Sequence, residues 1–194
     1  LCKKYDVILI ADEVQTGLGR TGWPFGSSLA GLEPDIISLA KPLAGGLPLS
    51  ATLIPKKVND YVKVGDHGTT FGGGPVTCAV AGKVLDILLH PEFLDNVKKR
   101  GKYLAGKLKE TAERFSFTGE VRGTGLLQGL EILQPEGFSK DLTKEVISKC
   151  EENGLIVLKS GKNIIRIAPP LVINEKEIDE GVAILEKTLE SFKI

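Results

Sequence analysis

The sequence predicts an α/β fold, and three observations support this prediction. Residues Val7–Ala11 and Ile36–Ala40 are continuous apolar runs, which are typical of central strands covered on both faces. Each run ends on charged residues, Asp12 and Glu13 after the first and Lys41 after the second. Segments with helical periodicity follow farther along the chain. In α/β sheets small molecules bind beyond the carboxyl ends of the strands, so these charges indicate a ligand site.

The first half of the chain contains three further predicted elements. Leu1–Tyr5 has the composition of a helix end that leads into the first strand. Ser50–Ile54 is a third strand, and it is stopped by Pro55, which cannot donate to a sheet. A helix rich in small residues is predicted over about Val76–Leu89, with Pro75 in its first turn.

The composition changes after Pro91. A long helix follows, and it is crowded with charged residues except on one face, which carries Leu94, Val97, Leu104 and Leu108. Strand-like segments over Glu120–Ile132 precede a helix over Leu142–Asn153, which Gly154 ends.

The last predicted elements are two strands and a helix. The strands cover Leu155–Leu158 and Asn163–Ala168. The helix begins with a capping-box spacing, Asn174 and Glu177. Its apolar face carries Ile178, Val182, Leu185 and Leu189.

Length and composition limit the possible classes of protein. The change of composition divides the 194 residues into predicted domains over 1–90 and 91–194. A formal net charge of zero gives no reason to expect binding to nucleic acid or to an anionic membrane surface. No apolar run is long enough to span a bilayer. The three cysteines, Cys2, Cys78 and Cys150, fit neither a disulfide framework nor a metal site, so we expect free thiols and no metal.

The segment Asp12-Glu13-Val14-Gln15 offers the groups that a pyridinium ring needs. Asp12 is a counter-ion for a ring nitrogen, Val14 an apolar contact for a ring face, and Gln15 a donor for a phenolic oxygen. Alternation along an extended segment places Asp12 and Val14 on one side and points Glu13 away, which favours a structural role for Glu13. Taken alone, Asp12 is also compatible with a turn residue at a strand end.

Lys41 is the candidate nucleophile. An apolar run precedes it, and the compact turn Pro42–Gly46 after it lets the backbone approach a ligand closely. A partly desolvated lysine loses its proton more readily, which Schiff-base formation requires. The alternative is a solvated lysine at a strand end. Together with Asp12, Lys41 forms the pair of groups that pyridoxal-phosphate enzymes need most.

Three more residues are candidate ligand-binding groups. Thr69 and Thr70 lie in a glycine-rich turn that suits a phosphate, although an ordinary helix-entry loop has the same composition. Arg166 interrupts an apolar strand, so it needs a partner in either a structural ion pair or a substrate carboxylate. Gly17–Gly22 matches the dinucleotide-binding fingerprint, but no helix is predicted to open within it, so a nicotinamide site is not favoured.

Five motifs occur along the chain in an order that is typical of one family. They are Ala11–Gly22, Ala40-Lys41 with Gly45-Gly46, Thr69–Gly73, Arg122–Leu126 and Arg166–Pro170. In this order they resemble the class III aminotransferases of the type I pyridoxal-phosphate fold, and the resemblance covers essentially the whole chain. It implies the carboxy-terminal part of a large mixed-sheet cofactor domain over 1–90, followed by a small α+β domain over 91–194.

The resemblance also implies roles for the cofactor-binding residues. Lys41 forms the Schiff base with pyridoxal 5'-phosphate and moves a proton between substrate and cofactor carbons. Asp12 keeps the ring nitrogen protonated, Val14 packs on the ring, and Gln15 donates to the phenolic oxygen. The implied catalytic residues are thus Lys41 and Asp12. The implied cofactor-binding set is Asp12, Glu13, Val14, Gln15, Lys41 and Thr70.

The family's site is shared across a homodimer. By resemblance, Thr70 binds the cofactor phosphate in the neighbouring subunit, and Thr69 lies near the substrate. Arg166 lies in the substrate pocket, where it pairs with a glutamate or a carboxylate. The implied partners are an amino acid, a 2-oxo acid and a second copy of the chain, with no nucleic acid or membrane.

The implied reaction is reversible transfer of the δ-amino group of N2-acetylornithine to 2-oxoglutarate, a step of arginine biosynthesis. Ala40–Pro48 and Gly65–Gly68 look most like family members with this activity. Transamination of ornithine or 4-aminobutyrate is the alternative, because those pockets differ mainly in residues outside this chain. A non-enzymatic alternative is an inactive dimerisation fragment, against which the joint presence of Asp12, Gln15 and Lys41 argues.

The chain departs from the family pattern in two respects. Gly74 stands where many relatives carry asparagine. The family's phosphate-binding turn, ring-stacking aromatic residue and main carboxylate-binding arginine all precede residue 1. We therefore expect a carboxy-terminal part of a longer protein that is inactive alone. The expected location is the mitochondrial matrix, with plastid and cytoplasm as alternatives.

Overall fold

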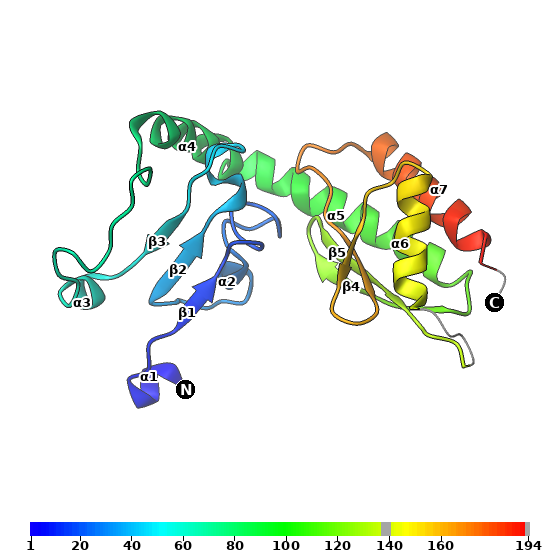
Figure 1. Ribbon diagram of the computed structural model, residues 1–194, viewed down its shortest axis with the longest axis horizontal. Coiled ribbons are helices and arrows are strands. Elements are labelled where there is room, and N and C mark those ends of the chain that lie inside the picture. Colours follow the sequence, from blue (N-terminus) through cyan, green and yellow to red (C-terminus); the bar gives the residue numbers. More distant parts are fainter. Residues whose placement is uncertain (137–140, 193–194) are drawn as a thin grey trace. The chain divides into compact units, whose positions relative to one another are not determined.

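The computed structural model describes residues 1–136 and 141–192 (Figure 1). The described residues divide into two compact units, one over Leu1–Leu94 and the other from Asp95 onward. Both units combine helices with a sheet, so the predicted α/β class is confirmed. None of the described helices is long and apolar enough to cross a membrane.

The first unit contains a mixed three-stranded sheet in the order β1–β2–β3 (Figure 1). The strands are β1 (Ile10–Asp12), β2 (Ile36–Leu39) and β3 (Ala51–Leu53). β1 and β2 are parallel, with Asp12 opposite Ser38, whereas β2 and β3 are antiparallel. All three strands lie within the predicted segments or one residue beyond them.

β1 is shorter and more exposed than the apolar run predicts. It begins at Ile10 because the chain before it has no ladder partner among the described residues; the amides of Asp35 and Ile36 both donate to the carbonyl of Leu9. Val7 is 55% exposed and Ile10 is 62% exposed. The described part of the chain therefore does not bury this strand on both faces, although the apolar run predicts such burial.

The core of the first unit lies between the sheet, a 3-10 turn and a helix. The turn η1 (Lys41–Ala44) follows β2, and α4 (Pro75–Leu88) packs against it. The buried residues of this cluster are Leu18, Leu39, Leu43, Ala44 and Ala81. The predicted helix with Pro75 in its first turn is confirmed. Three short helices complete the unit, α1 (Cys2–Tyr5), α2 (Gly26–Leu29) and α3 (Lys56–Asn59).

The second unit contains an antiparallel four-stranded sheet in the order β4–β5–β7–β6. The strands are β4 (Thr118–Thr124), β5 (Leu127–Ile132), β6 (Leu158–Ser160) and β7 (Ile164–Ile167). The predicted strand over Leu155–Leu158 is wrong in position. The amide of Leu155 donates to the carbonyl of Cys150 and closes the preceding helix, so pairing with β7 starts only at Leu158.

The helices of the second unit are α6 (Leu142–Glu152), α7 (Glu175–Glu190) and most of α5 (Pro91–Ala112), whose first residues belong to the first unit. The predicted apolar faces are confirmed, because Leu94, Val97, Leu104, Leu108, Ile178, Val182, Leu185 and Leu189 are all buried. The predicted capping box is also present. The Asn174 side chain accepts the amide of Glu177, whose side chain accepts the amide of Asn174.

Candidate functional site

Two hydrogen-bonded parallel strands end at the two central candidate residues. Asp12 is the last residue of β1, and Lys41 opens the turn that follows β2. Neighbouring strands lie about 4.8 Å apart, and three residues span at most about 11 Å, so the two Cα atoms are at most about 16 Å apart. Both side chains are exposed. A separation of this size leaves room for one six-membered ring between the carboxylate of Asp12 and the amine of Lys41.

The Asp12 carboxylate is held through one of its oxygens. Ser38 Oγ donates to Asp12 Oδ1 at 3.0 Å, and the amide of Val14 donates to the same oxygen at 3.1 Å. No described residue donates to Oδ2, which stays available as an acceptor. A carboxylate with a free oxygen at a strand end fits the protonated nitrogen of a pyridinium ring. Ser38 was missed in the sequence because its link to Asp12 depends on the register of β1 and β2.

Lys41 has an unusual backbone conformation. Its φ is 36°, and among the described non-glycine residues only Asp6 and Leu18 also have positive φ. Such values are uncommon outside glycine and cluster at functional sites. Buried Leu43 and Ala44 anchor the turn, and the next residue, Gly45, has a φ of 61°. The described residues do not shield Lys41 from water as expected, because the residue is exposed.

Glu13 points to the opposite side from Asp12, as alternation predicts. It is 3% exposed, and its carboxylate accepts the amides of Gly26 at 2.9 Å and Ser27 at 2.7 Å. Thr16 Oγ1 donates to the same carboxylate. Both oxygens are engaged within the protein, so Glu13 fastens the start of α2 to the end of β1. We therefore treat Glu13 as a structural residue, although the resemblance included it in the cofactor-binding set.

The environment of Glu13 favours its charged form. Burial alone raises the pKa of this carboxyl, but the hydrogen bonds from Thr16, Ser27 and Gly26 outweigh burial and hold the pKa below its usual value. The neighbouring Gly17 is required by the same close packing. A Cβ at Gly17 would lie 2.8 Å from the carbonyl oxygen of Glu13.

The segment after Glu13 turns instead of continuing the strand. Val14 is half-buried and Gln15 is exposed, and turns extend from Val14 to Thr21. Alternation thus does not decide where Val14 points. No helix starts within Gly17–Gly22, so this segment lacks the helix terminus that binds a dinucleotide.

Thr69 and Thr70 are exposed and lie between α3 and α4 in the sequence. Thr69 Oγ1 accepts the amide of Gly72 at 3.2 Å, which forms a local turn. No described hydrogen bond or ion pair joins either threonine to Asp12 or Lys41. The expected place of Thr70 in a partner's site stays a prediction.

Arg166 lies on the face of its sheet that is opposite to the helices. Ile165, its neighbour on β7, is fully buried, and side chains alternate along a strand. The register places Arg122, Gly129 and Arg166 in one row across β4, β5 and β7, so both arginines are on the same face. Arg122 pairs with Glu120 at 3.3 Å and with Glu131 at 3.8 Å. Arg166 belongs to the second unit, so its expected place beside the substrate stays a prediction.

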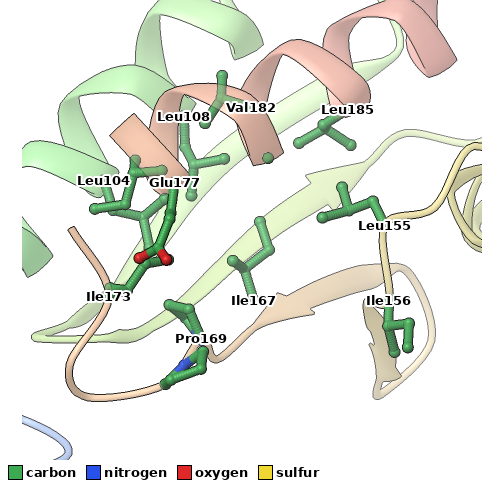
Figure 2. Close-up of a pocket in the computed structure, with 13 residues that line it drawn as sticks. Leu104, Leu108, Leu155, Ile156, Ile167, Pro169, Ile173, Glu177, Val182 and Leu185 are labelled. Carbon is green, nitrogen blue, oxygen red and sulfur yellow. The ribbon is translucent and has the colours of Figure 1, made fainter. Parts of the chain in front are cut away.

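The second unit also contains an apolar pocket of about 240 Å³ (Figure 2). Leu104, Leu108, Ile167, Val182 and Leu185 are among the residues that line it. Its one charged residue, Glu177, accepts the amide of Asn174 in the capping box. The pocket thus offers little to orient a charged amino acid, and we do not assign it to the reaction.

Comparison with known proteins identifies the class of protein. Residues 1–189 match the family model described as Aminotransferase class-III, so the chain belongs to the class III aminotransferases. This match covers both units.

Individual relatives refine the comparison. The mitochondrial acetylornithine aminotransferase of Eremothecium gossypii is 44% identical over 191 residues, which are 97% of this chain and 44% of that protein. A succinylornithine transaminase of Yersinia pseudotuberculosis is 42% identical over 190 residues, which are 98% of this chain and 45% of that protein. The ornithine δ-aminotransferase structure of Plasmodium falciparum superimposes with a TM-score of 0.88 at 37% identity, covering 98% of this chain and 48% of that one. The chain thus spans less than half the length of each of these relatives.

Proposed function

We propose that this chain takes part in a pyridoxal-phosphate-dependent transamination, with N2-acetylornithine as the amino donor and 2-oxoglutarate as the acceptor. The main observation behind the proposal is that Asp12 and Lys41 lie at the carboxyl ends of two paired parallel strands. The family match and the name of the Eremothecium gossypii relative support the substrate.

The roles proposed for the residues follow their chemistry. Pyridoxal phosphate, when bound, supplies an electron sink for the electrons of a broken C–H bond. Lys41 would hold the cofactor covalently, and its amine would carry the proton between the substrate carbon and the cofactor carbon. Asp12 would accept a hydrogen bond from the ring nitrogen through Oδ2 and would keep that nitrogen protonated. Val14 packs on the ring, and Gln15 donates to the phenolic oxygen.

We assign the substrate carboxylate to Arg166. The planar guanidinium group presents paired donors that suit a carboxylate. We place Thr69 near the substrate as well.

The two halves of the chain have separate proposed places in the family fold. Residues 1–90 form the carboxy-terminal part of the large cofactor domain, and residues 91–194 form the small domain. The exposed apolar surface of β1, including Ile10, supports the first assignment, because such surface is normally covered in a complete α/β sheet.

We further propose a homodimer with shared sites. Thr70 binds the cofactor phosphate in the site of the partner subunit. The support is the exposure of its segment, in which Tyr61 is 83% exposed and Phe71 is 87% exposed. Large apolar side chains exposed to solvent are typical of surfaces that a partner covers.

Ornithine and N2-succinylornithine are the alternative donors favoured by the other named relatives. 4-Aminobutyrate remains a further candidate on chemical grounds. An inactive dimerisation module is the candidate from a different class. The proposed location is the mitochondrial matrix, supported by the name of the Eremothecium gossypii protein, with plastid or cytoplasm as alternatives.

An amino-donor screen tests the proposal. The protein expressed from its complete gene is supplied with pyridoxal phosphate and 2-oxoglutarate, and glutamate formation is measured with N2-acetylornithine, N2-succinylornithine, ornithine and 4-aminobutyrate. We expect the highest kcat/KM with N2-acetylornithine. A higher value with another donor would reassign the substrate, and no glutamate from any of them would favour the non-catalytic module.

A further inference from the structure

The side chain of Ser38 is bonded to the one carboxylate on which the proposed reaction depends. Ser38 lies on β2 directly opposite Asp12 on β1, and its hydroxyl donates to Asp12 Oδ1 at 3.0 Å. The amide of Val14 donates to the same oxygen at 3.1 Å. Two donors on one oxygen fix the rotation of the carboxylate and leave Oδ2 facing away from both of them.

The backbone around this contact is pinned on both strands. The amide of Glu13 donates to the carbonyl of Ser38 at 3.0 Å, so the ladder continues past Asp12. The buried Glu13 side chain holds Gly26 and Ser27 from the other side of the strand. Asp12 therefore has a fixed backbone, and its remaining freedom is the side-chain rotation that Ser38 restricts.

We infer that Ser38 is a positioning residue for the reaction: its hydroxyl orients Asp12 so that Oδ2 meets the cofactor ring nitrogen. This inference rests on the proposed function. Ser38 also lies three residues before Lys41 on the same strand and turn, so one segment sets both the carboxylate and the amine. A carboxylate that is already oriented does not have to rotate when it binds the ring nitrogen, so no free energy is lost in reorienting it.

The free energy of the hydrogen bond between Ser38 and Asp12 depends on whether water reaches it. In the described chain Asp12 is exposed, and a hydrogen bond in contact with water contributes little. A ring bound over Asp12 excludes water from the contact and strengthens it. The effect of Ser38 is therefore expected on cofactor affinity and turnover, more than on the stability of the protein without cofactor.

The test compares three variants of the protein expressed from its complete gene. Ser38→Ala removes the hydroxyl, whereas Ser38→Thr keeps it. Thr52→Ala is the matched control, because Thr52 lies opposite Ser38 on β3 and has no hydrogen bond to Asp12 among the described residues. Each variant is also made together with Asp12→Asn. The measurements are the Kd of the cofactor-free protein for pyridoxal phosphate, kcat and KM for the amino donor, and the absorbance spectrum of the bound cofactor against pH.

We expect Ser38→Ala to raise the Kd for pyridoxal phosphate about tenfold and to lower kcat about tenfold. A change of this size corresponds to the loss of one hydrogen bond to a charged group. KM should change little, the spectrum of Ser38→Ala should shift in its pH dependence, and Ser38→Thr and Thr52→Ala should match the unchanged protein. With Asp12→Asn present, Ser38→Ala should add less than about twofold, because coupled residues are not additive.

Two outcomes would overturn the inference: equal behaviour of Ser38→Ala and Thr52→Ala, or an undiminished effect of Ser38→Ala beside Asp12→Asn. Failure of the unchanged protein to bind pyridoxal phosphate would instead refute the proposed function.

Discussion

The buried carboxylate of Glu13 accepts the backbone amide of Ser27 at 2.7 Å and thereby joins the end of β1 to the start of α2. The same side chain accepts the amide of Gly26 at 2.9 Å. A strand end that carries the candidate site is thus tied to a helix start farther along the chain. Because Asp12 precedes Glu13, this anchor also holds the proposed counter-ion in place.

Replacing Glu13 should destabilise the first unit. Glu13→Gln keeps the shape but removes the charge and one acceptor, and we expect a loss of about 1–3 kcal/mol in the free energy of unfolding. Urea denaturation measures this loss. Glu33→Gln is the control, because Glu33 forms an exposed ion pair with Lys3 and should change stability by less than about 1 kcal/mol. Equal effects of the two variants would contradict the anchoring role.

The contribution of Glu13 should depend on pH in the acid range. Its pKa in the folded protein is below the usual 4.5, so the unfolded chain takes up the proton first as the pH falls. The stabilisation is complete above the unfolded-state pKa and is lost as the pH falls through the folded-state pKa. The difference in unfolding free energy between the unchanged protein and Glu13→Gln should therefore shrink below about pH 4.5. A difference that stays constant down to about pH 3 would contradict this assignment.

Two glycines of α5 should respond to alanine in opposite directions. A Cβ at Gly101 would lie 2.4 Å from the backbone of Gly125, whereas a Cβ at Gly106 meets nothing within 4 Å. We expect Gly101→Ala to lower the free energy of unfolding by about 1–3 kcal/mol or more. Gly106→Ala should raise it by up to about 1 kcal/mol, because alanine favours the helix. Thermal unfolding of both variants checks the pair, and a stable Gly101→Ala would contradict the close approach.

Lys41 should carry the cofactor covalently. Borohydride reduction of the protein loaded with pyridoxal phosphate should leave a stable adduct on Lys41, visible by mass spectrometry of the digested protein. Lys41→Ala should leave none, because no other amine is proposed at that position. Lys56→Ala, which removes an exposed lysine of α3, is the control and should leave the adduct intact. An adduct that persists in Lys41→Ala would remove Lys41 from this role.

Thr70 should act in the site of the partner subunit, and mixed dimers test this. In a dimer of one Lys41→Ala chain and one Thr70→Ala chain, a shared arrangement puts both defects into one site and leaves the other intact. We expect such dimers to retain about half of the activity of the unchanged dimer, because one of the two sites is complete and works independently of the other. If Thr70 acts within its own chain, both sites carry a defect, and activity should fall to the level of the two single variants.

The sequence by itself determined the elements whose signals are local. The apolar faces of α5 and α7 follow from helical periodicity, and the capping box of Asn174 and Glu177 follows from a spacing of three residues. The ends of two apolar runs likewise indicated Asp12 and Lys41. These features depend on residues within one or two turns of each other, so the chain near each one is enough to predict it.

Only the tertiary structure decided the contacts between distant segments. The register that brings Ser38 to Asp12, the amides that engage Glu13, and the row that puts Arg122 and Arg166 on one sheet face all join residues far apart in sequence. The strand β6 also begins later than the sequence predicts, because the amide of Leu155 is bonded to the end of α6. Strand pairing and side-chain packing are selected by the whole fold, since a shift of one residue in register turns every side chain to the other face.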